Sequence, residues 1–170
     1  MKNIWKILMT ITVVAGAALI LSTAAFAASD SKTLTINATI SARAELVLAP
    51  TTINFADNSP TTVSSVSADN PVAVTARVRT GKATAATLTV ASANDLTSGS
   101  DTIPISAVSW TASGAPFIAG TLNKASAQSG ATFGNGSGTY NGTYSFFLAN
   151  NWTYNTGSYS ATVTYTLTAP

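Results

Sequence analysis

The chain has 170 residues, of which 8% are charged and 46% are hydrophobic, a composition that excludes disorder caused by high charge and low hydrophobicity. It contains no histidine and no cysteine, which excludes histidine acid–base catalysis, thiol nucleophiles, disulfide cross-links and zinc sites built on those side chains. The length fits one domain, and no internal repeat indicates a second.

Residues 1–27 have the layout of a secretory signal peptide. Lys2 and Lys6 give a positive start, residues 7–21 are uncharged and mostly apolar, and Ala25-Phe26-Ala27 places small residues where a signal peptidase cuts. The alternative is a transmembrane anchor, because the uncharged stretch extends for 22 residues. We favour cleavage before Ala28, since no basic stop-transfer cluster follows. We therefore expect an exported protein, secreted or on the cell surface, that is free of the membrane after cleavage.

Cleavage would also remove the excess positive charge. The whole chain carries +2, which Lys2 and Lys6 supply, so the mature protein has six basic and six acidic residues. A neutral protein has no electrostatic basis for binding nucleic acid or an anionic membrane. It also has little repulsion between copies. The expected partners are therefore further copies of the chain, as a homo-oligomer or fibre, or a glycan of the cell wall.

The first predicted element of the mature chain is a long β pattern from Leu34 to Leu48. Every even position in it is apolar, and polar residues fill all odd positions but one, as in a strand with one buried face. Strands usually have about 5–6 residues, whereas this run has fifteen. Three explanations remain open. The run bends near residues 42–44 to serve two sheets, or its first half is a slack tail, or that half adds a strand to a neighbouring copy.

The third explanation identifies donor side chains within residues 33–40. Main-chain hydrogen bonds would hold the added strand, and alternate side chains would fill pockets of the neighbour. The candidate donors are Leu34, Ile36, Ala38 and Ile40. On this interpretation residues 28–49 form an N-terminal strand segment and residues 50–170 form the main domain.

The remaining chain is predicted to be all β. From Ala28 onward it contains 25 threonines and 19 serines, and β-branched threonine suits the solvated face of a sheet. Period-two runs occupy residues 53–55, 72–79, 84–90, 102–110, 142–148 and 158–168. Thr80-Gly81-Lys82 is predicted to be a hairpin turn, and residues 58–60, 69–71, 94–101 and 130–138 are predicted loops. Seven or eight strands with one polar face each predict an antiparallel two-sheet β-sandwich.

The C-terminal strand carries a first resemblance. Tyr159-Ser-Ala-Thr-Val163-Thr-Tyr165-Thr-Leu167-Thr-Ala-Pro170 resembles the distal motif of WxL-type cell-surface domains, and Ile53-Asn54-Phe55 with residues 72–75 and 87–90 is similar to their earlier strands. The two tryptophan positions of that family are Ala86 and Tyr165 in this chain. The resemblance implies non-covalent attachment to the bacterial cell wall.

A second resemblance covers the layout of the chain. The signal peptide, the amphipathic first strand, the Ile-x-Phe strand and Thr156-Gly-Ser-Tyr-Ser-Ala-Thr-Val-Thr-Tyr165 resemble subunits of archaic fimbriae and of the spore coat U group. This resemblance implies an immunoglobulin-like or pilin-like sandwich that polymerises by strand exchange with a chaperone and an usher. The cysteines usual in that group are absent. The chain also looks like uncharacterised secreted proteins of environmental bacteria.

We predict no catalytic residue, metal site or cofactor. A serine nucleophile would lack its usual histidine base, and the six acids of the mature chain are scattered over separate loops and strand faces. Calcium was the most plausible ion, because acidic and amide side chains gather on two loops. They lack a DxDxDG spacing, and such residues are ordinary turn formers. These side chains are Asp57, Asn58, Asp69, Asn70, Asn94, Asp95 and Asp101.

Aromatic residues are densest between Tyr140 and Tyr159. Most of them, with Trp110, are expected in the core, whereas Trp152 and Tyr154 are the expected exposed pair, suited to stacking on a sugar. The sequence thus favours a non-enzymatic structural subunit of an extracellular or cell-surface assembly, such as a fimbria, that associates through strand edges. The alternative is a WxL-like domain that binds cell-wall glycan through Trp152 and Tyr154.

Overall fold

The structure is a computed structural model that describes residues 28–81 and 83–170. The predicted signal peptide, residues 1–27, and Lys82 of the predicted turn lie outside the described residues. The chain divides into two units, Met1–Ala38 and Thr39–Pro170, each described by itself. In the first unit, residues 28–38 contain no helix or strand, and their side chains are exposed.

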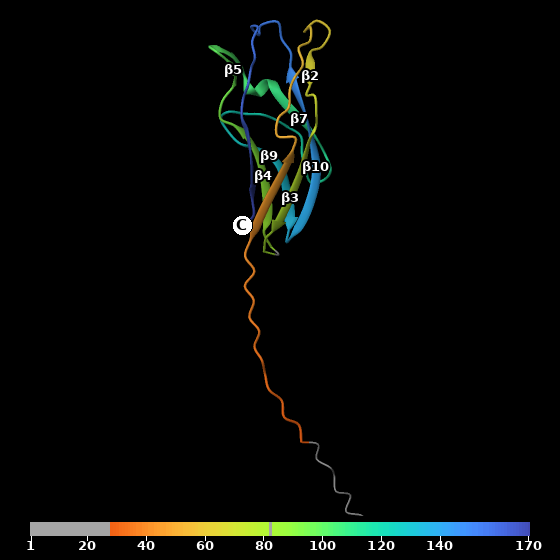
Figure 1. Cartoon of the computed structure of the whole chain (residues 1–170), viewed down its shortest axis with the longest axis vertical. Helices are drawn as coiled ribbons and strands as arrows, with labels where there is room; N and C mark the ends of the chain where they lie inside the picture. The colour runs from red at the N-terminus through yellow and green to blue at the C-terminus, as the bar shows by residue number, and fades with distance from the viewer. Residues whose placement is uncertain (1–27, 82) are drawn as a thin grey trace, which may run out of the picture. The chain divides into compact units, whose positions relative to one another are not determined.

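The second unit is built from antiparallel β-sheets (Figure 1). The largest sheet has the order β1-β3-β10-β7-β8, with β2 beside β10, and a smaller sheet has the order β11-β4-β9. Strands β5 and β6 form a separate hairpin, and a 3-10 turn, η1, covers Ile105–Ala107. The strands are β1 (Arg43–Ala49), β2 (Ser65–Ser67), β3 (Val72–Arg79), β4 (Ala85–Ser92), β5 (Leu96–Ser98), β6 (Asp101–Ile103), β7 (Val108–Ser113), β8 (Gly120–Thr121), β9 (Gln128–Asn135), β10 (Gly138–Ala149) and β11 (Val163–Thr168).

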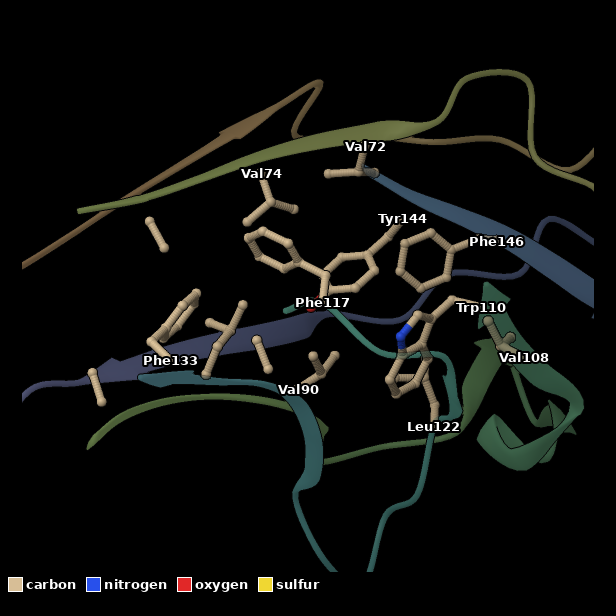
Figure 2. Packing of buried hydrophobic residues seen from close by; sticks show 14 of the residues in the cluster. Val72, Val74, Val90, Val108, Trp110, Phe117, Leu122, Phe133, Tyr144 and Phe146 are labelled. Atoms are coloured by element: carbon tan, nitrogen blue, oxygen red, sulfur yellow. The ribbon is translucent and has the colours of Figure 1, made fainter. Parts of the chain in front are cut away.

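The two larger sheets contribute inward-facing side chains to one hydrophobic cluster (Figure 2). The alternation predicted for residues 72–79 is confirmed, because every second residue of β3 from Val72 to Val78 is buried. Strand β4 behaves in the same way, with Ala86, Leu88 and Val90 fully buried. Burial of one face per strand is what fixes the period of two.

Aromatic rings fill the centre of this cluster. Trp110, Tyr144 and Phe117 pack edge to face, with centroids 6.1 Å apart for Trp110–Tyr144 and 5.8 Å for Phe117–Tyr144. The buried polar groups of Tyr144 and Trp110 both have hydrogen-bond partners. The Tyr144 hydroxyl donates to the carbonyl oxygen of Gly130 at 2.9 Å, and the Trp110 indole N–H donates to that of Ile118 at 2.9 Å. The core therefore contains polar aromatic residues without leaving these donors unsatisfied.

The predicted hairpin at residues 80–82 is wrong, because β3 and β4 belong to different sheets. The connection between them passes from one sheet to the other. The Thr80 hydroxyl braces it, since its oxygen lies 2.8 Å from the carbonyl oxygen of Thr84 and 2.6 Å from that of Gly136, and it accepts the Gly136 N–H at 3.1 Å. Turn residues predict that the chain reverses its direction, but they do not predict whether the next strand pairs with the preceding one.

Other boundaries differ for local reasons. Residues 102–110 do not form one strand, because Pro104 has no N–H to continue the ladder and separates β6 from η1 and β7. The predicted loops at 94–101 and 130–138 contain β5 and most of β9. Residues 53–55 contribute one bridge, from Phe55 to Ala68, instead of a strand. β1, predicted to belong to the N-terminal segment, is part of the largest sheet.

Gly142 of β10 gives a test of this packing. A Cβ at this position would overlap the Phe117 ring, whereas a Cβ at Gly134 of β9 would meet nothing within 4 Å. We expect Gly142→Ala to lower the free energy of unfolding by about 1–3 kcal/mol, the usual cost of overpacking. Gly134→Ala is the matched control and should change it by less than about 0.5 kcal/mol. Urea unfolding followed by tryptophan fluorescence measures both, and equal effects would contradict the packing.

Tyr144 predicts a loss of stability at high pH. Burial raises the pKa of Tyr144 to about 12, from the 10.0 that is usual for tyrosine. The unfolded chain therefore loses this proton first, so stability is full below pH 10 and falls as the pH rises from 10 towards 12. The loss is roughly 2–3 kcal/mol, at about 1.4 kcal/mol per pKa unit. Tyr144→Phe should cost about 1 kcal/mol at pH 7 and flatten this fall in urea titrations. An unchanged slope above pH 10 would contradict it.

Candidate assembly site

The first part of the candidate site is the segment of residues 33–40. Its apolar side chains have no partner surface, since Leu34 and Ile36 are each 82% exposed, Ile40 is 71% exposed and Ala38 is exposed. In the described chain, residues 28–42 belong to no strand, and β1 begins only at Arg43. The long run is therefore not two strands of one molecule. The slack tail and the donated strand are the two explanations that fit.

The sequence of this segment suits a strand that lacks a partner. Alternating threonine and isoleucine are strong strand formers, and no proline or glycine interrupts residues 28–49. Sheet edges that must stay single carry charges, proline or bulges. Residues 33–40 have none of the first two. The segment is thus a ready template for pairing with another strand.

The second part of the candidate site is formed by β1 and β11, which we call the β1–β11 edge, defined by Leu46, Leu48, Val163, Tyr165 and Leu167. Among the residues that the structure describes, β1 pairs only with β3, and β11 pairs only with β4. The two strands approach each other, yet no backbone hydrogen bond joins them in the described chain. Each therefore has one side on which its backbone groups are free.

The side chains of the β1–β11 edge face the core but remain half-exposed. Leu48 and Leu46 lie opposite Val74 and Ala76 of β3, and both β3 residues are buried. Tyr165 and Leu167 lie opposite Val90 and Leu88 of β4, which are fully buried. The register puts each pair on the same face of its sheet. The edge side chains are more exposed to solvent than their partners because no described strand pairs with the outer side of β1 or β11.

Tyr165 links this edge to the aromatic core. Its ring stacks on Tyr144, with centroids 6.1 Å apart and planes 23° apart. Burial raises the pKa of Tyr165 well above its usual value, and the neighbouring Tyr144 raises it further. A neutral, apolar ring is therefore kept at the edge at ordinary pH.

The opposite edges of the sheets are blunted. The Ile118 N–H donates to the carbonyl oxygen of Gly130 at 2.8 Å, and Phe117 bridges to Ala131, so part of the outer side of β9 is covered. Strand β8 has only two residues, Gly120 and Thr121. Short or covered edges resist pairing with other chains. Because β9 is partly covered and β8 is short, β1 and β11 are the less protected edges of the two larger sheets.

The predicted glycan-binding pair lies apart from these elements. Trp152 is 72% exposed, as expected, but Tyr154 is half-buried. Its N–H donates to the carbonyl oxygen of Asn151 at 3.2 Å, within the turn that carries both rings. No ring contact joins Trp152 to Tyr154 among the aromatic pairs of the described residues. The structure thus presents one exposed ring here rather than a flat pair.

The loops considered for calcium use their carboxylates in hydrogen bonds within the protein. Asp69 accepts the backbone N–H and the side-chain amide of Asn54, each at 2.9 Å, and these bonds lower the pKa of Asp69. Asp95 pairs with Lys124 at 2.5 Å and accepts the Ile105 N–H at 3.0 Å, which lowers the pKa of Asp95. Within residues 28–81 and 83–170, no three acidic side chains lie close enough to hold a metal ion.

In the part that the structure describes, no helix has the length and apolarity to cross a membrane. No protein-family model matches the chain, and the search of curated proteins also gives no match.

Proposed function

We propose that this protein is a non-enzymatic, secreted structural subunit of an extracellular or cell-surface assembly. Residues 33–40 of one copy add a strand to the β1–β11 edge of the next. One observation carries the proposal. The same chain has an unpaired amphipathic segment and an edge whose inward-facing side chains are half-exposed. The main domain is a two-sheet sandwich that follows a cleaved signal peptide.

The two surfaces are chemically complementary. A strand of residues 34–40 places Leu34, Ile36, Ala38 and Ile40 on one face. That spacing matches the apolar positions 163, 165 and 167 of β11. Each buried leucine or isoleucine contributes about 1.5–3 kcal/mol, and the free N–H and C=O groups of both edges gain hydrogen bonds. At about 3.3 Å per residue, the segment is also long enough to pair along all of β11.

The geometry of such a contact leads to a fibre. Donor and acceptor are different surfaces of one subunit, so each added copy presents a new edge and a new segment. Contacts of this heterologous kind produce open chains unless the rotation closes a ring. The absence of cysteine excludes disulfide bonds between subunits. The resemblance to archaic fimbrial and spore coat U subunits supports the same mode of assembly.

A charge placed on either face of the segment tests the proposal. Ile36→Asp puts a carboxylate on the apolar face, whereas Thr35→Asp puts the same charge on the polar face of the same strand. We expect Ile36→Asp to reduce the sedimenting polymer at least tenfold and Thr35→Asp to change it little, because only the first buries the charge. Analytical ultracentrifugation and electron microscopy measure both. Equal losses, or undiminished fibres after deletion of residues 28–40, would overturn strand donation.

The second candidate function is a WxL-like domain that binds cell-wall glycan, and the exposed Trp152 ring favours it. Aromatic faces stack on sugar rings. In that case the protein co-pellets with purified peptidoglycan as a monomer, and Trp152→Ala weakens this binding at least tenfold. Thr153→Ala in the same turn is the matched control. Co-pelleting that survives Trp152→Ala but fails with Ile36→Asp would assign the wall association to the polymer instead.

A further inference from the structure

The charges of the second unit are segregated towards its two ends. One end holds three arginines and one glutamate, where β1 begins, β3 ends and β10 begins. Arg43 lies opposite Arg79 in the β1–β3 register, and Glu45 lies opposite Arg77. Arg77 and Glu45 pair at 2.5 Å, whereas Arg43 and Arg79 take part in no ion pair between described residues. The side chains of these three arginines and one glutamate, which we call the basic end, carry a net charge of two positive units.

The acidic end lies at the other ends of the same strands. It holds four aspartates, Asp57, Asp69, Asp95 and Asp101. Among the described residues, Lys124, which pairs with Asp95, is the one cation at this end. The Asn150 side chain, just after β10, donates to the carbonyl oxygens of Asn58 and Val63, at 2.9 Å and 3.0 Å, and so ties the loop that follows Asp57 to the end of β10. Asn155 donates to Asp101 at 2.8 Å. In Figure 1, β2 and β5 mark this end, away from the start of β1.

Chain connectivity relates the donor segment to one of these ends. Residue 40 is followed after two residues by Arg43, so the donor segment enters the unit at its basic end. β1 then runs towards the acidic end, and β11 runs back from it, because Val163 pairs with Ser92 and Thr168 with Thr87. A donated strand can lie along the β1–β11 edge in two directions. They differ in which end of the acceptor meets the body of the donor.

We propose that the basic end of one copy docks on the acidic end of the next copy, and that this contact sets the direction of the assembly. The inference rests on the proposed function. A donor strand parallel to β1 and antiparallel to β11 brings the donor's arginines to the acceptor's aspartates. The reverse direction brings arginines to arginines. Arg43 and Asp57 are exposed and Arg79 and Asp101 are half-buried, so the attraction acts between groups that stay in contact with water. It therefore steers association and chooses the direction more than it adds affinity.

Salt dependence separates this contact from strand pairing. We expect Arg43→Glu/Arg79→Glu to slow fibre elongation at least tenfold at 20 mM salt, and Asp57→Lys/Asp101→Lys to slow it as well. Both deficits should shrink at 0.5 M salt, because screening removes the new repulsion. Combining the four substitutions restores opposite charges on the two ends and should recover much of the rate. Light scattering measures elongation, and near-ultraviolet circular dichroism confirms folding. Arg43→Gln, at an exposed position, is the milder variant.

Engineered cysteines report the direction, since the chain has none of its own. Thr35 and Thr39 are about 13 Å apart along an extended strand, and both lie on its polar face. In the proposed direction Thr35→Cys forms a disulfide between copies with Thr168→Cys faster than Thr39→Cys does. Faster cross-linking from position 39, or none from either, overturns the inference. So do charge-reversed variants that elongate as fast as the unaltered protein. Failure of the unaltered protein to polymerise defeats the proposed function itself.

Discussion

The structure depends on the fact that a β-strand at the edge of a sheet is hydrogen-bonded and packed on one side only. Inside the sheets, side chains such as Leu88 and Val90 are sealed by a strand on each side. On β1 and β11 the same inward direction leads to half-exposed leucine, valine and tyrosine side chains. Both sheets thus pack on the core, but no strand of the described chain covers the flank of the core between β1 and β11. Residues 33–40 have the alternating composition of a strand with one apolar face.

The aromatic core explains how this flank can stay open without the fold collapsing. Trp110, Phe117 and Tyr144 pack together in the centre, and the polar atoms of Trp110 and Tyr144 donate to carbonyl oxygens of Ile118 and Gly130, at and near β9. Little of this packing requires β1 or β11, which contact the cluster from its margin. Tyr165 extends the ring stack outward to the edge. The core is thus fully buried at its centre and half-exposed along β1 and β11, which leaves apolar surface for the added strand that we propose.

The period of hydrophobicity predicted the strands whose alternation is unbroken, and it failed where glycine interrupts the pattern or the chain changes sheet. β3 was predicted with its bounds because its apolar positions are also its buried ones. Most of β9 was assigned to a loop, since Gly130 and Gly134 interrupt its pattern, and Gly130 is needed because a side chain there would strike the Tyr144 hydroxyl. Sheet membership was not predictable for β3 and β4, because a turn sequence does not say whether the chain returns to the same sheet. The exposed Trp152 was predicted, but the half-buried Tyr154 was not, since the turn that holds it is defined by backbone contacts.

The most informative region is the one where the alternating sequence pattern extends beyond the strand that the structure contains. Apolar alternation from Leu34 to Leu48 continues for nine residues before β1 begins, and in that stretch the apolar side chains are exposed. An alternating pattern is costly to keep on a segment that remains in water, because exposed isoleucine and leucine promote indiscriminate association. The pattern makes physical sense if it encodes burial against a surface outside the molecule. In the assembly that we propose, copies of the chain itself provide such a surface at the β1–β11 edge, and the segregated charges at the two ends of the unit give that contact a direction.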